Sequence, residues 1–240
     1  MEIRVRKYQI AIVIATLLLL MIGLYMVRDS SLVWANYLYG DPNYYFKRQL
    51  IYAIIGIFVF FVSIKIKISF LKKYVVWFLL ISLLLLILVI IPGVGITKNG
   101  STSWLGFSLI SFQPSEFFKI SLVLFFSFYL ERFYYQSQKI KTLFPLLLIT
   151  LLGFVLIMLQ PDFGTCMVLA MSIFIVLYTS RLDNKWFVIF ILIGLLSIAG
   201  LIMFESYRFK RITAFLNPFE DPLGSGFQII QSLYALGPGG

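Results

Sequence analysis

Two stretches of this sequence place ionisable side chains at the ends of long apolar runs. The first is QPSEFFK at 113–119, and the second is QPDFGT at 160–165. Glu116 and Lys119 stand three residues apart, so they lie on the same side of a helix. Ionisable groups at membrane depth are costly and usually mark a functional cavity. The sequence therefore predicts a cavity around Glu116, Lys119 and Asp162, although an embedded ion pair can also simply tie helices together.

The chain contains no histidine, which is the commonest general base and the commonest metal ligand. Without a histidine to activate them, Ser101 and Ser115 are poor candidates for nucleophiles. The glycine-containing stretches at 93–95 and 237–240 lack the strand and helix context of a nucleotide-binding loop. Any proton or metal chemistry must therefore use carboxylates, and the residues alone identify no metal site.

The elements that hold these residues belong to a membrane protein. Of the 240 residues, 61% are hydrophobic and 12% are charged, so the chain is far more apolar than a usual soluble domain. The net charge of +10 comes from short basic clusters between apolar runs. This arrangement favours anionic lipid over nucleic acid as the partner of the basic residues. The single cysteine, Cys166, has no partner for an internal disulfide.

Apolar runs of transmembrane length predict an all-α, polytopic bundle of about seven membrane helices. A polar loop is expected over 28–49, with a turn at Asp41-Pro42-Asn43, and a second loop over 92–112. Pro161 either breaks the chain to bring Asp162 to the cavity or is a purely structural break. The expected spans are residues 10–27, 50–66, 74–91, 114–130, 143–159, 166–179 and 186–204.

Basic residues predict the orientation of this bundle. The N-terminus and the loops after the second, fourth and sixth spans carry twelve lysines and arginines, whereas the alternate loops carry seven. By the positive-inside rule, the N-terminus is cytoplasmic. Glu116, Lys119 and Asp162 then lie near the outer ends of their spans, where they can line one cavity open to the outer leaflet. Trp104 in the preceding loop is either an interfacial anchor or a substrate contact.

The last part of the chain, residues 205–240, is predicted to be an external segment that lies along the membrane. Arg208, Lys210 and Arg211 lie outside against the charge bias, so lipid headgroups or an anionic substrate should compensate them. The stretch 227–236 has apolar residues at helical spacing and can form a short interfacial helix over the cavity mouth. The alternative is a flexible loop whose basic residues only touch lipid.

Five motifs in order along the chain carry a resemblance to a known family. They are Lys47-Arg48-Gln49, NGSTSWLG at 99–106, QPSEFFK at 113–119, QPDFGT at 160–165 and the stretch 211–240. On these motifs the sequence resembles the SEDS family (shape, elongation, division and sporulation), which includes FtsW, RodA and SpoVE. The last motif is more similar to the FtsW and SpoVE branch than to the RodA branch.

The resemblance implies a peptidoglycan glycosyltransferase on the outer face of the bacterial cytoplasmic membrane. Its substrate would be lipid II, an undecaprenyl-pyrophosphate-linked disaccharide pentapeptide. It would act in division, sporulation or elongation, together with a class B penicillin-binding protein. The family fold has roughly ten spans, and its catalytic aspartate is expected beyond Gly240, in the large external loop that begins at residue 205. The resemblance thus implies that 1–240 is a C-terminally truncated single domain, which alone should be inactive.

Within this sequence the catalytic base therefore stays unassigned. Cationic groups or a divalent ion such as Mg²⁺ would have to hold the pyrophosphate. The same charged cavity would suit a lipid II flippase, and a non-catalytic scaffold that recruits a penicillin-binding protein is a third alternative. The candidates for the substrate cavity are Arg48, Trp104, Gln113, Ser115, Glu116, Lys119, Asp162 and Arg211.

Overall fold

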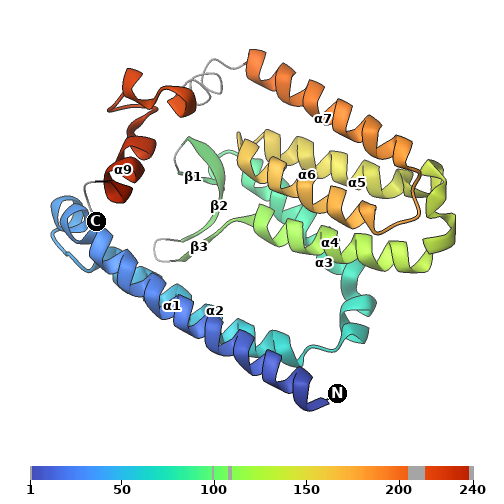
Figure 1. Cartoon of the computed structure of the whole chain (residues 1–240), viewed down its shortest axis with the longest axis horizontal. Helices are drawn as coiled ribbons and strands as arrows, with labels where there is room; N and C mark the ends of the chain where they lie inside the picture. The colour runs from blue at the N-terminus through green and yellow to red at the C-terminus, as the bar shows by residue number, and fades with distance from the viewer. Residues whose placement is uncertain (1, 99, 108–109, 205–213, 238–240) are drawn as a thin grey trace. The chain divides into compact units, whose positions relative to one another are not determined.

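The computed structural model describes residues 2–98, 100–107, 110–204 and 214–237 (Figure 1). They divide into two compact units, one made of residues 1–131 and 146–170 and the other of residues 132–145 and 171–240. The helices are α1 (Glu2–Tyr39), α2 (Tyr44–Lys65), α3 (Ile68–Ile90), α4 (Pro114–Arg132), α5 (Ile140–Met158), α6 (Phe163–Tyr178), α7 (Asn184–Phe204) and α9 (Phe227–Leu236), with short 3₁₀ turns η1 (Tyr134–Gln138) and η2 (Pro218–Glu220). The strands are β1 (Ile96–Lys98), β2 (Ser101–Phe107) and β3 (Ile110–Phe112).

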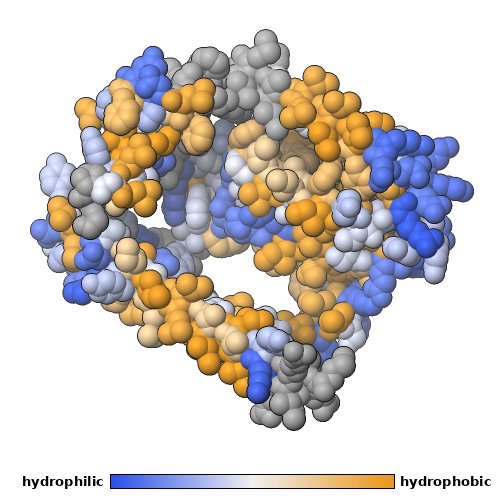
Figure 2. Space-filling model, viewed as in Figure 1, coloured by the Kyte–Doolittle hydropathy of each residue, from blue (hydrophilic) through white to orange (hydrophobic). Residues whose placement is uncertain are grey.

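The chain is a multi-pass membrane protein. Residues 7–39 of α1 and the helices α2, α3 and α5 are each long and apolar enough to cross a bilayer. Helix α6 is a shorter apolar helix, α7 is apolar over residues 184–197, and α4 has charged residues in its first and last turns. Apolar side chains cover the visible surfaces of α1 and α7 (Figure 2), which suits helices that face lipid. The prediction of a helical membrane bundle is confirmed.

The polar loop predicted over 28–49 is wrong, because α1 continues to Tyr39 and α2 already begins at Tyr44. The polar residues after the first apolar run are compatible with a helix; the Ser30 hydroxyl, for example, donates to the Met26 carbonyl at 2.7 Å. Gly40, with a φ of +65°, ends α1 because it adopts the left-handed conformation at no steric cost. Helix α3 likewise begins at Ile68 instead of residue 74.

The connection between α1 and α2 is stabilised by Asp41. Its carboxylate accepts hydrogen bonds from the Asn43 backbone at 3.0 Å and from the Lys47 ammonium at 2.7 Å. The hydrogen bond from Lys47 holds the pKa of Asp41 below its usual value. The predicted turn at Asp41-Pro42-Asn43 is therefore confirmed.

The loop predicted over 92–112 contains an antiparallel sheet in the order β1-β2-β3. Lys98 pairs with Ser101 across a turn at Gly100, which has a φ of +82°. Leu105 pairs with Phe112 on the other side of β2. A Cβ atom at Gly95 would collide with the Val89 carbonyl, so the hairpin starts directly against the end of α3. The sheet was missed because two of its strands have only three residues, which leaves too short an alternation to recognise.

One apolar face of α4 packs against α5. Ser115, Phe118, Leu122 and Phe126 are fully buried and recur at the spacing of one helix face. The ring of Phe118 lies directly over Gly153 of α5, where a Cβ atom would collide with it. Small residues allow helices to approach closely in a membrane, so Gly153 sets the distance between α4 and α5.

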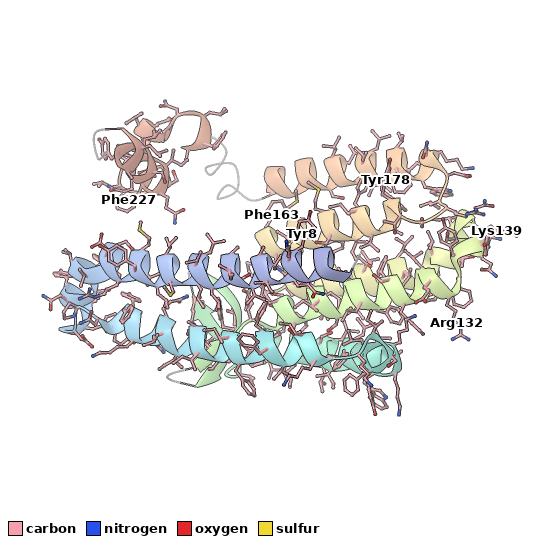
Figure 3. All side chains as sticks on the ribbon, turned by 60° about the horizontal axis from the view of Figure 1, so that its bottom comes forward. Tyr8, Arg132, Lys139, Phe163, Tyr178 and Phe227 are labelled. Atoms are coloured by element: carbon pink, nitrogen blue, oxygen red, sulfur yellow. The ribbon has the colours of Figure 1, made fainter. Side chains whose placement is uncertain are left out.

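The basic connections that the positive-inside rule assigns to one membrane face contact one another in pairs. Lys72, at the start of α3, forms an ion pair with Glu131 at the end of α4, with a separation of 2.5 Å. In the other unit, the Arg181 backbone N–H donates to the Ser137 hydroxyl at 3.1 Å. The Arg181 guanidinium also lies 4.9 Å from the Tyr135 ring centroid. Figure 3 shows Arg132 and Lys139 at the same end of the helices, and η1 lies between them in the sequence.

Replacing Gly153 by alanine should lower the free energy of unfolding by about 1–3 kcal/mol, because the added methyl group overpacks the buried Phe118 ring. Unfolding of the purified protein in a mild detergent, followed by circular dichroism, measures the change. The matched control is Gly56→Ala in α2, where a Cβ atom would meet nothing within 4 Å. A Gly153→Ala variant as stable as the Gly56→Ala variant would contradict the close contact.

Candidate functional site

The break between α5 and α6 is held by side chains from the sheet and by the backbone of α3. The Gln160 carbonyl accepts hydrogen bonds from the hydroxyls of Ser101 at 2.5 Å and Ser103 at 3.4 Å. The Gln160 amide donates to the Leu86 carbonyl at 3.3 Å. Gln160 is buried, so these partners replace the water that a broken helix would otherwise need. The β2 strand therefore fixes the position of the residues that follow Gln160.

Asp162 joins the start of α4 to the start of α6. Its Oδ2 atom accepts hydrogen bonds from the Gln113 amide at 2.6 Å and from the Thr165 hydroxyl at 2.8 Å. Its Oδ1 atom accepts from the Thr165 backbone N–H at 3.1 Å, which caps the first turn of α6. Gln113 and Asp162 were both predicted cavity residues, and the structure brings them into direct contact.

Glu116 and Lys119 form the expected ion pair on α4, with Lys119 Nζ 2.8 Å from Glu116 Oε1. The lysine side chain is 18% exposed and the glutamate side chain 57%, so the cation is the more enclosed partner. The pair follows Gln113 within one turn, since the Glu116 N–H donates to the Gln113 carbonyl at 3.1 Å. The start of α4 therefore carries both the ion pair and the contact to Asp162.

Ser115 is placed differently from its neighbours in the sequence. It is fully buried on the face of α4 that carries Phe118, and among the described residues its hydroxyl oxygen has no hydrogen-bond partner. Glu116 lies on another face of the helix and is 57% exposed, whereas Lys119, one turn after Ser115, lies at the edge of the same face and keeps 18% of its side chain exposed. The structure thus groups Ser115 with the helix-packing core.

A second group of contacts surrounds two cations, Arg48 and Lys98. Arg48 donates to the Tyr44 hydroxyl at 2.7 Å, and Lys98 donates to the Ser111 hydroxyl at 2.6 Å. The Lys98 ammonium also lies 4.3 Å from the centroid of the Trp104 ring, within the range of a cation–π interaction. Two predicted candidates, Arg48 and Trp104, therefore lie in the part of the first compact unit (residues 1–131 and 146–170) that α2 and the sheet form.

Tyr52 connects the two cations. It lies one helical turn after Arg48 on the same side of α2, and its hydroxyl accepts a hydrogen bond from the Ser111 N–H at 3.0 Å. Ser111 in turn holds Lys98. Sequence reasoning missed Lys98 and Tyr52, because the link depends on strand pairing. The signal available for Lys98 was its place directly before the NGSTSWLG motif.

A divalent cation fits these residues poorly. Mg²⁺ and Ca²⁺ are held by several oxygen ligands, and the described part of the chain has no group of three or more histidine, cysteine, aspartate or glutamate side chains that could hold a metal ion. Lys98 and Arg48 carry positive charges, so these two residues are the candidates for binding an anionic group directly. Arg211, the remaining cavity candidate, lies outside the described residues.

Comparisons with known proteins agree on one family. A family model described as a cell cycle protein, FtsW/RodA/SpoVE, matches residues 9–240. The chain is 45% identical to stage V sporulation protein E of Bacillus subtilis, over 95% of this chain and 63% of that protein. It is 37% identical to a probable peptidoglycan glycosyltransferase FtsW of Coxiella burnetii, over 98% of this chain and 63% of that protein. The chain therefore spans less than two thirds of the length of these relatives.

Solved structures give the same result for the fold. One of them comes from work described as "Structural coordination of polymerization and crosslinking by a peptidoglycan synthase complex". Its sequence is 28% identical to this chain, and the two structures align with a TM-score of 0.64 over 91% of this chain and 64% of that chain. The rod shape-determining protein RodA of Thermus thermophilus is 25% identical with a TM-score of 0.54, over 76% of this chain and 58% of that chain. The helical membrane bundle is thus shared with these proteins.

The contact between Gln113 and Asp162 predicts an energetic coupling. In a double-mutant cycle of Gln113→Ala and Asp162→Ala, the coupling energy should be about 1–3 kcal/mol, because removing either side chain leaves the partly buried polar group of the other without this hydrogen bond. The cycle removes the separate contribution of Asp162 as the helix cap of α6. Unfolding free energies in mild detergent supply the four values.

The exposed pair Asp183 and Lys185, 3.2 Å apart, serves as the control cycle. Its coupling should be at most about 1 kcal/mol, as for other surface ion pairs. A coupling between Gln113 and Asp162 that is no larger than that of the control would rule out the hydrogen bond as a link between α4 and α6.

Proposed function

The chain belongs to the FtsW/RodA/SpoVE family of cell cycle proteins, and from this premise we propose that the whole protein is a peptidoglycan glycosyltransferase that polymerises lipid II. The observation that carries the proposal is the similarity to relatives named probable peptidoglycan glycosyltransferase FtsW, which extends over 98% of this chain at 37% identity. We place the protein in the bacterial cytoplasmic membrane with the N-terminus inside, as the distribution of basic residues indicates.

The two cations suit the pyrophosphate of a lipid-linked sugar. Charge-assisted hydrogen bonds from Lys and Arg to phosphate oxygens are stronger than hydrogen bonds between neutral groups. The contacts of Lys98 among the described residues are with the neutral Ser111 hydroxyl and the Trp104 ring, so its charge is available to an anionic ligand. Trp104 offers an apolar face beside that charge, where a lipid-linked substrate can lie. Arg48 completes the anion site from α2.

In the proposed reaction, a sugar hydroxyl attacks the anomeric carbon of a second lipid-linked sugar. The new glycosidic bond forms as the bond from that carbon to the pyrophosphate oxygen breaks, and undecaprenyl pyrophosphate leaves. A carboxylate has to accept the proton of the attacking hydroxyl. The carboxylate of Asp162 already accepts hydrogen bonds from Gln113 and Thr165. These contacts fix the Asp162 carboxylate between the starts of α4 and α6, so we assign Asp162 a positioning role.

The partner and the cellular process follow from the same relatives. One structural relative is described as a peptidoglycan synthase complex that coordinates polymerization with crosslinking, which supports pairing of this protein with a crosslinking enzyme of the class B penicillin-binding type. The relatives named for sporulation and for FtsW support a role in sporulation, division or elongation.

The ion pair on α4 gives a direct test of this function. In the full-length protein, Glu116→Ala should lower the rate of lipid II polymerisation on the order of 100-fold, because the enclosed Lys119 loses its partner and the substrate site shifts. Polymer formation from labelled lipid II, by the purified protein with its partner, measures the rate. Expression and elution in gel filtration should stay unchanged.

Glu131→Ala is the matched control, since Glu131 also pairs with a lysine but at the opposite end of α4, where both side chains are exposed. It should polymerise at the normal rate. Normal polymerisation by Glu116→Ala, or full activity of the charge-swapped Glu116→Lys, Lys119→Glu variant, would reduce the pair to a packing contact. Transfer of lipid II across vesicles without any polymer would favour the flippase alternative.

A further inference from the structure

The turn between α2 and α3 forms a basic pocket that the proposed glycosyltransferase reaction does not use. It is an open depression of about 580 Å³ whose lining residues are all exposed, namely Lys65, Ile66, Lys67, Ser69, Phe70 and Lys73. The pocket exists because α2 ends at Lys65 and α3 begins at Ile68. The two residues between them are extended, with ψ angles of 122° at Ile66 and 141° at Lys67. This bend spreads three lysines around one opening.

The described residues leave the positive charges of this pocket without an ion-pair partner. Among the described residues, no carboxylate forms an ion pair with Lys65, Lys67 or Lys73. The neighbouring carboxylate of Glu131 forms its ion pair with Lys72. Lys73 contacts the neutral Tyr74 ring at 5.3 Å. Three ammonium groups around one opening, without carboxylate partners among the described residues, create a positive potential that attracts an anionic ligand.

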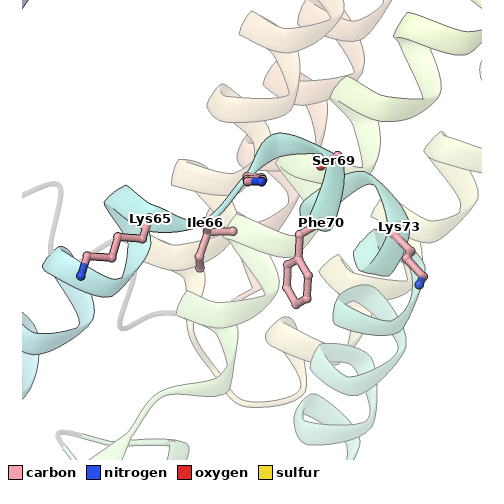
Figure 4. Close-up of a pocket in the computed structure, with 6 residues that line it drawn as sticks. Lys65, Ile66, Ser69, Phe70 and Lys73 are labelled. Carbon is pink, nitrogen blue, oxygen red and sulfur yellow. The ribbon is translucent and has the colours of Figure 1, made fainter.

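The pocket also has an apolar side. Ile66 and Phe70 are exposed, and in Figure 4 their side chains point in the same direction, with Lys65 and Lys73 on either side. A free anion would make no use of these apolar groups. A ligand with an anionic group and a hydrocarbon chain would engage both the lysines and the apolar residues.

The position of the pocket relative to the bilayer matches such a ligand. Lys65 lies at the opposite end of α2 from Arg48, and a helix rises 1.5 Å per residue, so the two are roughly 25 Å apart. This distance is close to the thickness of the hydrocarbon core, about 30 Å. The pocket therefore lies at the opposite membrane surface from the proposed anion site, at the level of lipid headgroups.

The backbone adds hydrogen-bond donors to this site. The first turn of α3 begins at Ile68, and its N-cap residue, Lys67, makes no side-chain capping hydrogen bond. Free N–H groups at a helix start favour phosphate oxygens. Ser69, which also lines the pocket, lies in this first turn.

We propose that the pocket between α2 and α3 binds the phosphate of an anionic phospholipid, with Lys65, Lys67 and Lys73 around the headgroup and the acyl chains along Ile66 and Phe70. A phosphodiester accepts charge-assisted hydrogen bonds from the three ammonium groups. Basic pockets between membrane helices recognise anionic headgroups in this way. The bound lipid fixes the bend between α2 and α3 at the membrane surface.

Trp77 provides a reporter for the test. It lies four residues after Lys73, on the same side of α3, and is exposed. In the full-length protein, with every tryptophan other than Trp77 changed to phenylalanine, quenching of Trp77 is measured in phosphatidylcholine vesicles as dibrominated phosphatidylglycerol replaces phosphatidylcholine. The curve gives the preference of the site near Trp77 for the anionic lipid.

The parent protein should prefer phosphatidylglycerol roughly tenfold or more, given the attraction of three lysines to an anionic headgroup. The Lys65→Gln, Lys67→Gln, Lys73→Gln variant should lose this preference. The matched control changes Lys139, Lys141 and Lys185 to glutamine, which removes the same number of charges from the other basic connections and should keep the preference. The single change Lys73→Gln, at an exposed position, should lower it in part.

Three results would overturn the proposal. An equal loss in the pocket variant and in the control would mean general attraction to the membrane surface. If the parent protein showed no preference for phosphatidylglycerol, the pocket would not bind anionic lipid, and an acidic protein segment would be the better candidate ligand. Abolition of the preference by inorganic phosphate at constant ionic strength would mean that the pocket takes a free anion.

Discussion

A helix that breaks inside a membrane exposes backbone groups that only the protein can satisfy. In this chain the requirement falls on residues 159–162, between α5 and α6. The Gln160 carbonyl is satisfied by Ser101 and Ser103, and its side chain is tied to Leu86. The small sheet thus acts as the hydrogen-bond partner of the break, and Asp162 extends the same network to Gln113 at the start of α4.

The positions of the membrane helices could be predicted from the sequence because long apolar runs have few alternatives in a bilayer. The short helix α9, Phe227–Leu236, was predicted with the same bounds from its apolar spacing alone. Boundaries at the membrane surface were less predictable, since polar residues such as Ser30 continue α1 by donating a hydrogen bond to the helix backbone. The sheet could not be predicted, because its stability depends on contacts with residues far along the chain, such as Gln160.

In the candidate site, too, local contacts could be predicted from the sequence and contacts between distant residues could not. The pairing of Glu116 with Lys119 follows from helical spacing and was predicted. The contact of Gln113 with Asp162 joins residues from two different helices, so the sequence could supply the candidates without their pairing. Lys98 was missed because its role depends on the register that places it near Ser111 and Trp104.

The β2 serines hold the break between α5 and α6, and hydrogen–deuterium exchange of the Ser101→Ala, Ser103→Ala variant tests this role. Loss of both hydroxyls leaves the buried Gln160 carbonyl without these two donors. Amides in the peptide that covers residues 160–167 should then exchange roughly tenfold faster, while those in the middle of α3 exchange at the parent rate. Unchanged exchange over 160–167 would show that the two hydroxyls do not hold the break.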